Sequence, residues 1–422
     1  MTGLALAHEF ARRGVSHMVF EAADRPGGVI RSGRVEGRVL EWGPQRTRMT
    51  AGLSGLVQEL GLAAQVVYAP PGLPLYVYAD RALRQVPSSA RALLSGDLLS
   101  WRGKLRLALE PLTAGPRDEE RVATLLTRKL GPEAYERMVG PLYGGLYASD
   151  PADMVVGLSL GPVLRELGIG RSLLLSLLRR GGSIDPPAAC SFVEGMQTLT
   201  DALHAAHADA VRLGTPVRGL APSGKGWTIE LDGGSVDAEA VVLTCEAPAA
   251  AELLAGVAPA AAERARRLVY NPLGVVHLHA ETDLRGLGYQ VGLGEDLATR
   301  GVTWNESLFG REGVYTAYLG GAKNPAVVEE PDEWLGQVAV DEFRRVTGYD
   351  ARVLAVARER MPAWDVSWRA LEGVELPRGI RIAANWMSRP GIPGRLAEAR
   401  RLAERLSWVG SPIGARSHPR GT

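Results

Sequence analysis

The spacing of apolar residues predicts helices in some segments of the chain and strands in others. Apolar residues recur at helical spacing over residues 52 to 62, 331 to 348 and 396 to 406. Residues 88 to 181 also have a helical pattern, rich in leucine and arginine and broken at the Gly-Pro pairs 115–116, 131–132 and 161–162. Strand-like alternation returns from residue 211 onward, with a turn at Asp232-Gly233-Gly234 between two of the strands. The mixture predicts an α/β fold built from more than one unit.

The first 21 residues carry half of a dinucleotide-binding pattern. Gly3 opens an amphipathic helix that ends at Gly14, and a short apolar strand follows and ends at Glu21. In a βαβ nucleotide-binding unit the last glycine of Gly-x-Gly-x-x-Gly permits close helix packing, and an acid about 20 residues later binds the ribose hydroxyls. The first strand and the first two glycines would lie before Met1. We therefore expect a nucleotide fold whose first strand is missing from this chain.

A Pro-Gly-Gly turn follows this half pattern. Gly27 and Gly28 allow the backbone to approach a bound group, and Arg25 can donate hydrogen bonds to a phosphate. The alternative is an ordinary turn with a solvated arginine. Because the Pro-Gly-Gly turn comes soon after Glu21, we favour a role for this turn in nucleotide binding.

These segments resemble a known flavoprotein superfamily. The pattern Glu-Ala-x-x-Arg-x-Gly-Gly at residues 21–28, followed by Gly43-Pro44, is similar to that of amine oxidases, phytoene desaturases and protoporphyrinogen oxidases. Residues 139–151 resemble the Pro-Leu-x-x-Gly-x-Tyr-Ala-x-Asp-Pro signature of the HemY-type protoporphyrinogen and coproporphyrinogen oxidases. Residues 192–199 resemble that family's Gly-Gly-x-x-x-Leu segment. The resemblance extends with gaps from Gly3 to about Leu406.

The resemblance implies an α/β fold in which a Rossmann-like FAD-binding domain is interleaved with an α+β substrate domain and a helical insertion. We expect the FAD-binding domain at residues 1–70, 188–265 and 378–406, the helical insertion at 71–187, the substrate domain at 266–377 and a tail at 407–422. The residues expected to bind FAD are Gly3, Glu21, Ala22, Arg25, Gly28, Val29, Gly43, Pro44, Gln45, Arg46, Val217, Gly391, Ile392 and Pro393.

Two places depart from the family pattern. Near the C-terminus the family reads Gly-Asn-Tyr-x-Gly-Gly-Val-x-Val-Pro beside the flavin, and this chain has Ser388 and Arg389 in place of the two glycines. The family also often places an arginine, which meets a substrate propionate, just before a Phe-x-Tyr-like strand. Residues 73–74 are Leu-Pro here, so that arginine is absent. The arginines that could replace it are Arg46, Arg81 and Arg84.

The activity implied by the resemblance is FAD-dependent oxidation of protoporphyrinogen IX or coproporphyrinogen III to the porphyrin in heme biosynthesis. Three two-electron rounds with dioxygen as acceptor would release hydrogen peroxide. The sequence assigns no catalytic residue. Two alternatives stay open: another flavin oxidase or desaturase of the same fold, acting on an amine or a polyene, and a flavin-free scaffold protein.

Composition and charge exclude several other classes. The chain has 46% hydrophobic and 23% charged residues, which excludes a disordered chain. A net charge of +1 gives no field that would attract nucleic acid. The histidine pairs at 204/207 and 277/279 have no acidic third ligand at suitable spacing, so we expect no metal. The sequence carries no signal that points to a particular oligomeric state.

We expect a cytoplasmic protein that contacts the inner face of a membrane peripherally. Cys190 and Cys245 are too few and too far apart for a disulfide framework, and no apolar run approaches the ~18 residues of a membrane span. Residues 164–180 form a basic amphipathic stretch that could lie among lipid headgroups. The alternative is an ordinary helix pair that closes the substrate pocket.

Overall fold

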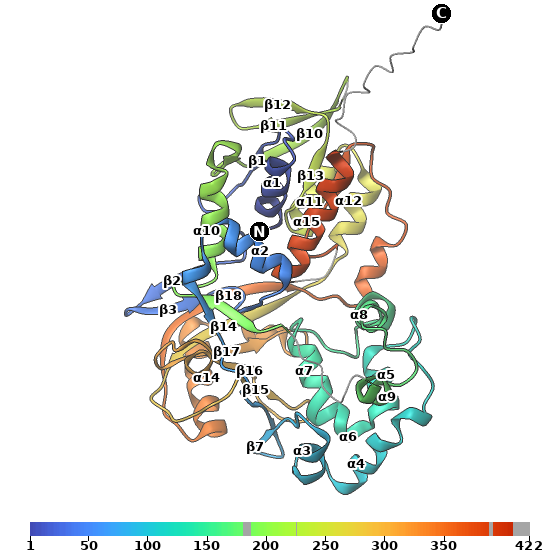
Figure 1. Cartoon of the computed structure of the whole chain (residues 1–422), viewed down its shortest axis with the longest axis vertical. Helices are drawn as coiled ribbons and strands as arrows, with labels where there is room; N and C mark the ends of the chain where they lie inside the picture. The colour runs from blue at the N-terminus through green and yellow to red at the C-terminus, as the bar shows by residue number, and fades with distance from the viewer. Residues whose placement is uncertain (180–186, 225, 388–390, 408–422) are drawn as a thin grey trace, which may run out of the picture.

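The structure is a computed structural model that describes residues 1–179, 187–224, 226–387 and 391–407. Figure 1 shows three parts. The part at the top contains both ends of the described chain and the residues expected to bind a nucleotide, and we call it the nucleotide part. A large sheet lies at the lower left and a group of helices at the lower right. Ser388 and Arg389 lie outside the described residues, as does nearly all of the predicted tail.

Four short parallel strands form the nucleotide part. Strand β1 (Val19–Phe20) pairs with β9 (Val211–Arg212), and β13 (Val241–Leu243) pairs with β19 (Ile380–Ile382). The described strands include none that is hydrogen-bonded between β1 and β13. A Cβ atom added to Gly3 would lie 3.0 Å from Thr244 Oγ1 and 3.6 Å from Val19 Cγ1, so the helix that begins here lies between the two pairs.

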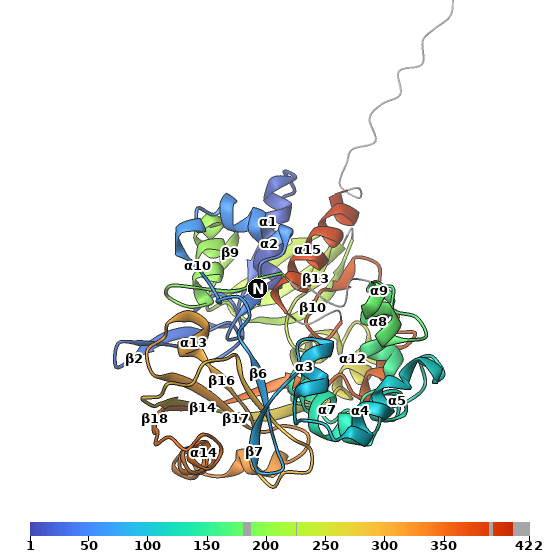
Figure 2. The same ribbon diagram turned by 60° about the horizontal axis from the view of Figure 1, so that its bottom comes forward.

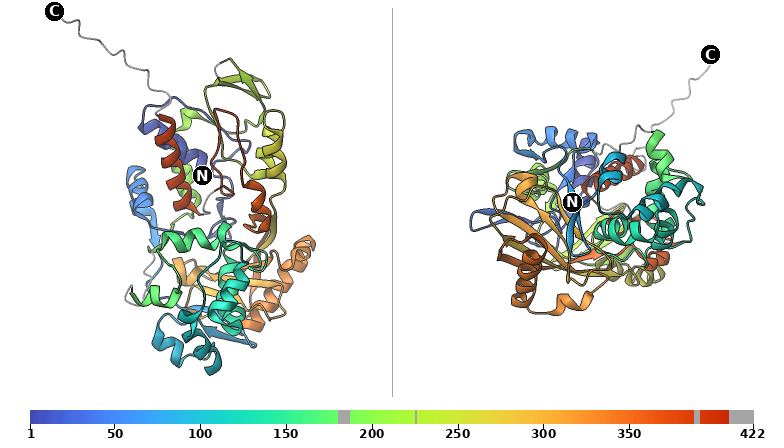
Figure 3. Two further views of the ribbon diagram at one scale, coloured as in Figure 1. Left: turned by 90° about the vertical axis from the view of Figure 1, so that its right-hand side faces the viewer. Right: turned by 90° about the horizontal axis from the view of Figure 1, so that it is seen from below.

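Helices cover these strands because their apolar faces need partners. The N-terminal helix α1 and the C-terminal helix α15 lie side by side (Figure 3) and share a core of Ala5, Leu6, Ala399, Leu402 and Ala403. The helices of this part are α1 (Thr2–Arg12), α2 (Ala51–Glu59), α10 (Gln197–Ala206), α11 (Ala247–Leu254), α12 (Pro259–Arg266) and α15 (Ile392–Ser407). The predicted helix at residues 52 to 62 is thus confirmed as α2.

Three small antiparallel sheets extend from the nucleotide part. The sheet that contains residues 217–238 confirms the predicted strand, Gly-Gly turn and strand around residue 233, because one strand ends at Leu231 and the next begins at Gly234. The strands of these sheets are β2 (Ser32–Val35) with β3 (Arg38–Glu41), β4 (Thr47–Arg48) and β5 (Val66–Tyr68) on either side of β8 (Ala189–Phe192), and β10 (Val217–Ser223), β11 (Gly226–Leu231) and β12 (Gly234–Ala238).

The large sheet has seven strands in the order β18-β14-β17-β16-β15-β6-β7. Helix α14 (Asp332–Thr347) packs on one face through Leu335, Ala339 and Phe343, as the helical pattern at 331 to 348 predicts. The strands are β6 (Leu75–Ala79), β7 (Ala82–Gln85), β14 (Tyr270–His279), β15 (Gly288–Val291), β16 (Thr299–Trp304), β17 (Val314–Gly320) and β18 (Arg352–Pro362), and α13 (Asn305–Phe309) follows β16.

The structure places residues 75–85 differently from the predicted helical insertion at 71–187. They form β6 and β7, and β6 pairs in parallel with β15, so that Val77 lies opposite Gln290. Such a pairing joins segments far apart in the sequence, and local periodicity does not reveal it. The helical part therefore begins after β7.

The helical part lies beside the sheet, with α3 next to β6 and β7 (Figure 2). Its elements are α3 (Ala90–Ser95), α4 (Trp101–Ala108), the 3₁₀ turn η2 (Glu110–Leu112), α5 (Val122–Leu130), α6 (Pro132–Ala134), the π-helical turn η3 (Tyr135–Val139), α7 (Gly140–Gly145), α8 (Leu160–Glu166) and α9 (Leu173–Arg179).

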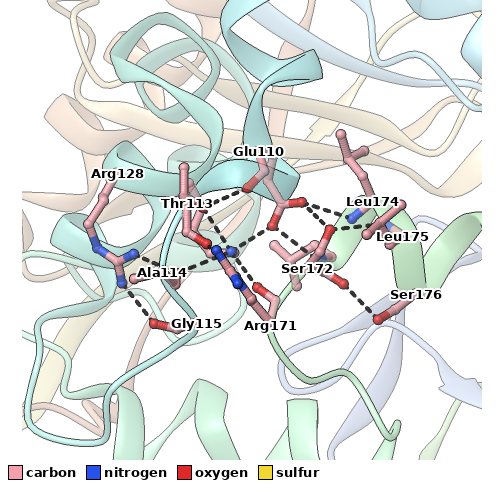
Figure 4. A network of polar contacts seen from close by, with 12 residues as sticks. Glu110, Thr113, Ala114, Gly115, Arg128, Arg171, Ser172, Leu174, Leu175 and Ser176 are labelled. Atoms are coloured by element: carbon pink, nitrogen blue, oxygen red, sulfur yellow. Dashed lines mark hydrogen bonds and ion pairs between the residues drawn. The ribbon is translucent and has the colours of Figure 1, made fainter.

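A buried ion pair holds α9 against α5 (Figure 4). The side chains of Glu110 and Lys129 are both 0% exposed, and 2.7 Å separates Glu110 Oε1 from Lys129 Nζ. Lys129 also donates to the carbonyl oxygen of Arg171, and Glu110 accepts from Ser172 Oγ and from the backbone N–H of Leu173. Burial raises the pKa of Glu110, but its hydrogen bonds with Lys129 and Ser172 outweigh burial and keep that pKa below its usual value.

Candidate functional site

A cavity of about 2410 Å³ extends from the nucleotide part to the seven-stranded sheet. One end is lined by the start of α1, by the end of β1 and by the strand β13. The other end is lined by β15, β16 and β17 and by residues that follow α7. The cavity therefore connects the two parts that the sequence assigns to nucleotide and substrate.

At the nucleotide end, the elements of the half pattern meet as expected. Gly3 lies on the cavity wall at the first turn of α1, and Glu21 follows β1. Glu21 Oε1 accepts a hydrogen bond from the backbone N–H of Ala23 at 3.0 Å, which fixes the carboxylate at the cavity edge. This arrangement offers a carboxylate acceptor close to a helix N-terminus.

The Gly-Gly turn forms the next part of the wall. Gly27 and Gly28 have φ angles of 102° and 62°, which glycine adopts without the steric cost that other residues incur. Arg25 Nη2 donates to Gly28 O at 2.7 Å, and Arg25 Nη1 donates to Ile30 O at 3.2 Å. The Arg25 guanidinium thus braces the backbone of the turn.

A close backbone approach joins this turn to residues 43–46. A Cβ atom added to Gly43 would lie 2.0 Å from the carbonyl oxygen of Val29. Only glycine fits at this position, which keeps the turn and residues 43–46 together on one side of the cavity.

A second buried ion pair joins the nucleotide part to the seven-stranded sheet. Arg311 precedes β17, and Glu41 is the last residue of β3. The distance from Arg311 Nη2 to Glu41 Oε1 is 2.8 Å, and both side chains are almost fully buried. Glu41 also accepts hydrogen bonds from Ser32 Oγ and from the backbone N–H of Met196. Burial raises the pKa of Glu41 despite the nearby Arg311. The pair fixes the two walls of the cavity relative to each other.

The signature segment at residues 139–151 forms part of the far wall. Gly145, Leu146 and Ala148 line the cavity at the end of α7. The carbonyl oxygen of Ala148 accepts a hydrogen bond from Asn271 Nδ2 at 3.0 Å, and Ala148 has a φ of 50°. A Cβ atom at position 145 would contact the side-chain amide of Gln290 of β15, so that amide lies directly against the end of α7.

The cavity wall brings together twelve of the fourteen residues expected to bind FAD. They are Gly3, Glu21, Ala22, Gly28, Val29, Gly43, Pro44, Gln45, Arg46, Val217, Gly391 and Ile392. Arg25 and Pro393 do not line it. Arg25 is engaged with backbone carbonyls, and Pro393 is the second residue of α15.

The three arginines considered as partners of a substrate propionate differ in whether they reach the cavity. Arg46 lines the cavity. Arg84 forms an ion pair with Asp97, and Arg81 is exposed at the turn between β6 and β7. Neither Arg81 nor Arg84 lines the cavity.

Sequence reasoning missed a polar wall on the seven-stranded sheet. Gln290 of β15, Arg300 and Thr303 of β16, and Tyr318 of β17 all line the cavity. Burial raises the pKa of Tyr318 to about 12, so its hydroxyl is protonated at neutral pH and can donate a hydrogen bond. These residues lie on three strands at unrelated sequence spacing, and no motif connects them.

Metal and thiol chemistry have no visible site in the described part of the chain. No group of three His, Cys, Asp or Glu side chains gathers there in a way that could hold a metal ion. His207 contacts His8, with His207 Nε2 3.0 Å from His8 Nδ1. Burial raises the pKa of Cys190 and of Cys245 to about 11, so both thiols are protonated near pH 7.

Comparisons with known proteins agree with this geometry. Residues 1–373 match the family described as flavin containing amine oxidoreductase. Protoporphyrinogen oxidase 1 of Spinacia oleracea is 28% identical over 382 residues, covering 81% of this chain and 68% of that protein. Coproporphyrinogen III oxidase of Mycobacterium leprae is 26% identical over 421 residues, covering 93% of this chain and 92% of that protein.

A solved structure from Exiguobacterium sp. 255-15 superimposes with a TM-score of 0.80 at 21% identity, covering 97% of each chain. This likeness concerns the fold, which is a mixed α/β fold with a large mixed sheet. The family match spans most of the sequence, and the chain therefore belongs to the flavin containing amine oxidoreductase family.

Proposed function

We propose that this chain oxidises a porphyrinogen, protoporphyrinogen IX or coproporphyrinogen III, to the porphyrin in heme biosynthesis, with FAD as cofactor and dioxygen as acceptor. The observation that carries the proposal is the place of residues 139–151. The segment resembling the porphyrinogen oxidase signature lines the same cavity as the nucleotide-binding residues, through Gly145, Leu146 and Ala148. The relatives named above support the same substrate class.

The residues at the nucleotide end of the cavity fit FAD. Glu21 supplies acceptors for ribose hydroxyls, and the turn at Gly28 and the close contact between Gly43 and Val29 leave backbone groups near the cavity. When bound, FAD would accept two electrons from the substrate in each of three rounds and pass them to dioxygen.

The chain's own residues orient the substrate and keep water out. Leu146, Leu273 and Val275 give the cavity an apolar surface suited to a flat macrocycle. Gln290 and Tyr318 face the same space with hydrogen-bonding groups that fix how the macrocycle lies. No side chain is assigned as a base, because loss of protons from the substrate is favoured by aromatisation of the product.

We propose that the nucleotide part takes up a further parallel strand between β1 and β13. Each of these strands pairs on one side only, and the usual strand order of a dinucleotide-binding sheet places its first strand at this point. A protein that carries a strand ending in Gly-x-Gly-x directly before Thr2 is expected to retain more FAD than the printed sequence alone. Equal flavin content and equal melting temperature of the two proteins would contradict this proposal.

We also propose peripheral contact with an anionic membrane, and the exposed surface favours α4 as the point of contact. Trp101 and Leu105 of α4 are 72% and 66% exposed, and Leu109 and Leu112 continue the same apolar stripe. Exposed Arg102 can contact lipid headgroups. No helix in the described part of the chain has both the length and the apolar character needed to cross a bilayer.

The stretch 164–180, for which this contact is predicted, is partly built into the core. Leu164 of α8 is buried, and Leu173 packs against the helical cluster that contains Leu107 and Leu126. Leu175 is exposed, and the side chains of residues 177 and 178 lie outside the described part.

The proposed activity is tested by supplying the FAD-loaded protein with each porphyrinogen in air. We expect porphyrin fluorescence to appear, with three molecules of hydrogen peroxide released for each porphyrin. A primary amine and a diamine serve as competing substrates. Peroxide release with an amine, and none with either porphyrinogen, would contradict the proposal and favour the amine oxidase alternative.

A further inference from the structure

A β-bulge in β16 turns Arg300 toward the cavity. In the pairing of β16 with β17, Thr299 lies opposite Leu319 and Gly301 lies opposite Tyr318, so Arg300 is one extra residue on its strand. A bulge breaks the alternation of side chains and can aim a residue at a neighbouring site. Thr299 is buried away from the cavity, whereas Arg300 and the adjacent Gly301 both line it.

The neighbours of Arg300 on the sheet are polar and line the same cavity. Gly301 lies between Gln290 of β15 and Tyr318 of β17 in one row across the sheet. A Cβ atom at Gly301 would lie 2.7 Å from Gln290 Nε2, so the Gln290 amide lies over this glycine and the glycine is what lets it lie there. Arg300 and Thr303 stand on the same strand and line the same space.

The Arg300 guanidinium has little bonding of its own. One hydrogen bond, to Leu297 O at 3.3 Å, is found for it among the described residues, and none of their carboxylates forms an ion pair with it. Glu342 is nearby, but its two carboxylate oxygens accept from the backbone N–H groups of Ala298 and Thr299. A largely buried guanidinium stays charged, so it requires an anion or other acceptors.

Two cations and two carboxylates lie near one another around Arg300. Burial lowers the pKa of Arg300, and the same is true of Lys323, whose pKa is further lowered by the charge of Arg300. Glu342 and Asp150, the latter at the end of the signature segment, offset these two cations. Because backbone N–H groups already occupy the two Glu342 oxygens, the Arg300 guanidinium keeps donors for a ligand in the cavity.

We propose that Arg300 binds a carboxylate of the substrate. The inference rests on the proposed function, because a porphyrinogen carries its carboxylates on the rim of an otherwise apolar ring. A guanidinium aimed from a rigid strand can hold one such carboxylate through two parallel hydrogen bonds, with Tyr318 and Thr303 able to add donors. Arg300 would then do the work of the arginine that is absent before β6, where Leu73 and Pro74 stand.

The test compares binding of an acidic porphyrin with binding of its neutral ester. The probes are coproporphyrin III and the same porphyrin with every propionate methylated, titrated in one detergent buffer and followed by porphyrin fluorescence. The proteins are the FAD-loaded wild type, Arg300→Leu, Arg300→Lys and the control Arg91→Leu, which removes an exposed arginine of α3. Melting temperature and flavin content are measured for each to establish that it is folded.

We expect Arg300→Leu to weaken binding of the acid by about 10- to 150-fold and to leave binding of the ester within about twofold. Arg300→Lys should fall between Arg300→Leu and the wild type, since a lysine keeps the charge and loses the bidentate geometry. With the acidic porphyrinogen as substrate, Arg300→Leu should raise KM more than it lowers kcat. Arg91→Leu should match the wild type.

Two outcomes would overturn the inference. A folded Arg300→Leu protein that binds the acid as tightly as the wild type shows that Arg300 does not contact a carboxylate. Equal weakening of acid and ester shows that Arg300 only shapes the cavity. If the wild type binds neither porphyrin, the proposed function itself fails, and this result is distinct from both.

Discussion

Replacing Lys129 with methionine would leave the Glu110 carboxylate buried without its cation. Removing one partner of a buried ion pair costs about 3–5 kcal/mol of unfolding free energy. Three hydrogen bonds to Glu110 remain in the variant, from Ser172 Oγ and from the N–H groups of Leu173 and Leu174, so we expect a loss near the lower end, about 3 kcal/mol. Urea unfolding of the full chain, followed by circular dichroism, measures this loss.

The free energy of unfolding should depend on pH in opposite directions in the wild type and in the variant. In the wild type the pKa of Glu110 lies below its usual value, so its contribution is present above the unfolded-state pKa, ~4.3, and is lost as pH falls through the lower native pKa. In Lys129→Met, burial without the cation raises that pKa, so this variant loses stability as pH rises above ~4.3. The difference in unfolding free energy between the two proteins should be small near pH 4 and largest near pH 7.

The double variant Glu110→Gln/Lys129→Met is the matched control, because it removes both charges and keeps an acceptor for α9. We expect it to recover most of the lost stability, with a coupling energy of about 2 kcal/mol. Hydrogen exchange at the backbone amides of Leu173 and Leu174 reports locally on the start of α9. A double variant as unstable as Lys129→Met, or a loss that does not depend on pH, would refute this reasoning.

Three further changes test other parts of the molecule. Glu21→Ala should weaken FAD retention by roughly 1.5–3 kcal/mol, the range for hydrogen bonds to a charged group, and unchanged flavin occupancy after gel filtration would count against the assignment. Gly43→Ala should destabilise the protein by about 1–3 kcal/mol, because the new methyl group would lie 2.0 Å from a carbonyl oxygen, whereas Gly52→Ala, in open space, should not lower the melting temperature. Combined Trp101→Ser and Leu105→Ser should reduce flotation with anionic liposomes at low salt, and undiminished flotation would exclude α4 as the contact.

The fold was predictable where local pattern decides it. The helix α14 follows from apolar residues at helical spacing, and the turn between β11 and β12 follows from paired glycines between two alternating runs. The pairing of β6 with β15 was not predictable, because it depends on contacts between segments more than 200 residues apart.

The same contrast holds at the site. Gly3 and Glu21 could be proposed from the sequence because nucleotide binding by a βαβ unit requires a fixed spacing, and the structure places both on the wall of one cavity. Arg300 gave no such signal. Its position on the cavity wall results from one extra residue in the pairing of β16 with β17, and a bulge has no reliable local sequence pattern.

Anaerobic mixing of the FAD-loaded protein with a porphyrinogen tests the central claim most directly. If the cavity brings substrate and cofactor together, the visible absorption of the oxidised flavin should disappear as porphyrinogen is added, and it should return when dioxygen is admitted. Porphyrin absorption should grow over successive cycles. A flavin band that porphyrinogen leaves unchanged, in protein shown to retain FAD, would contradict the account.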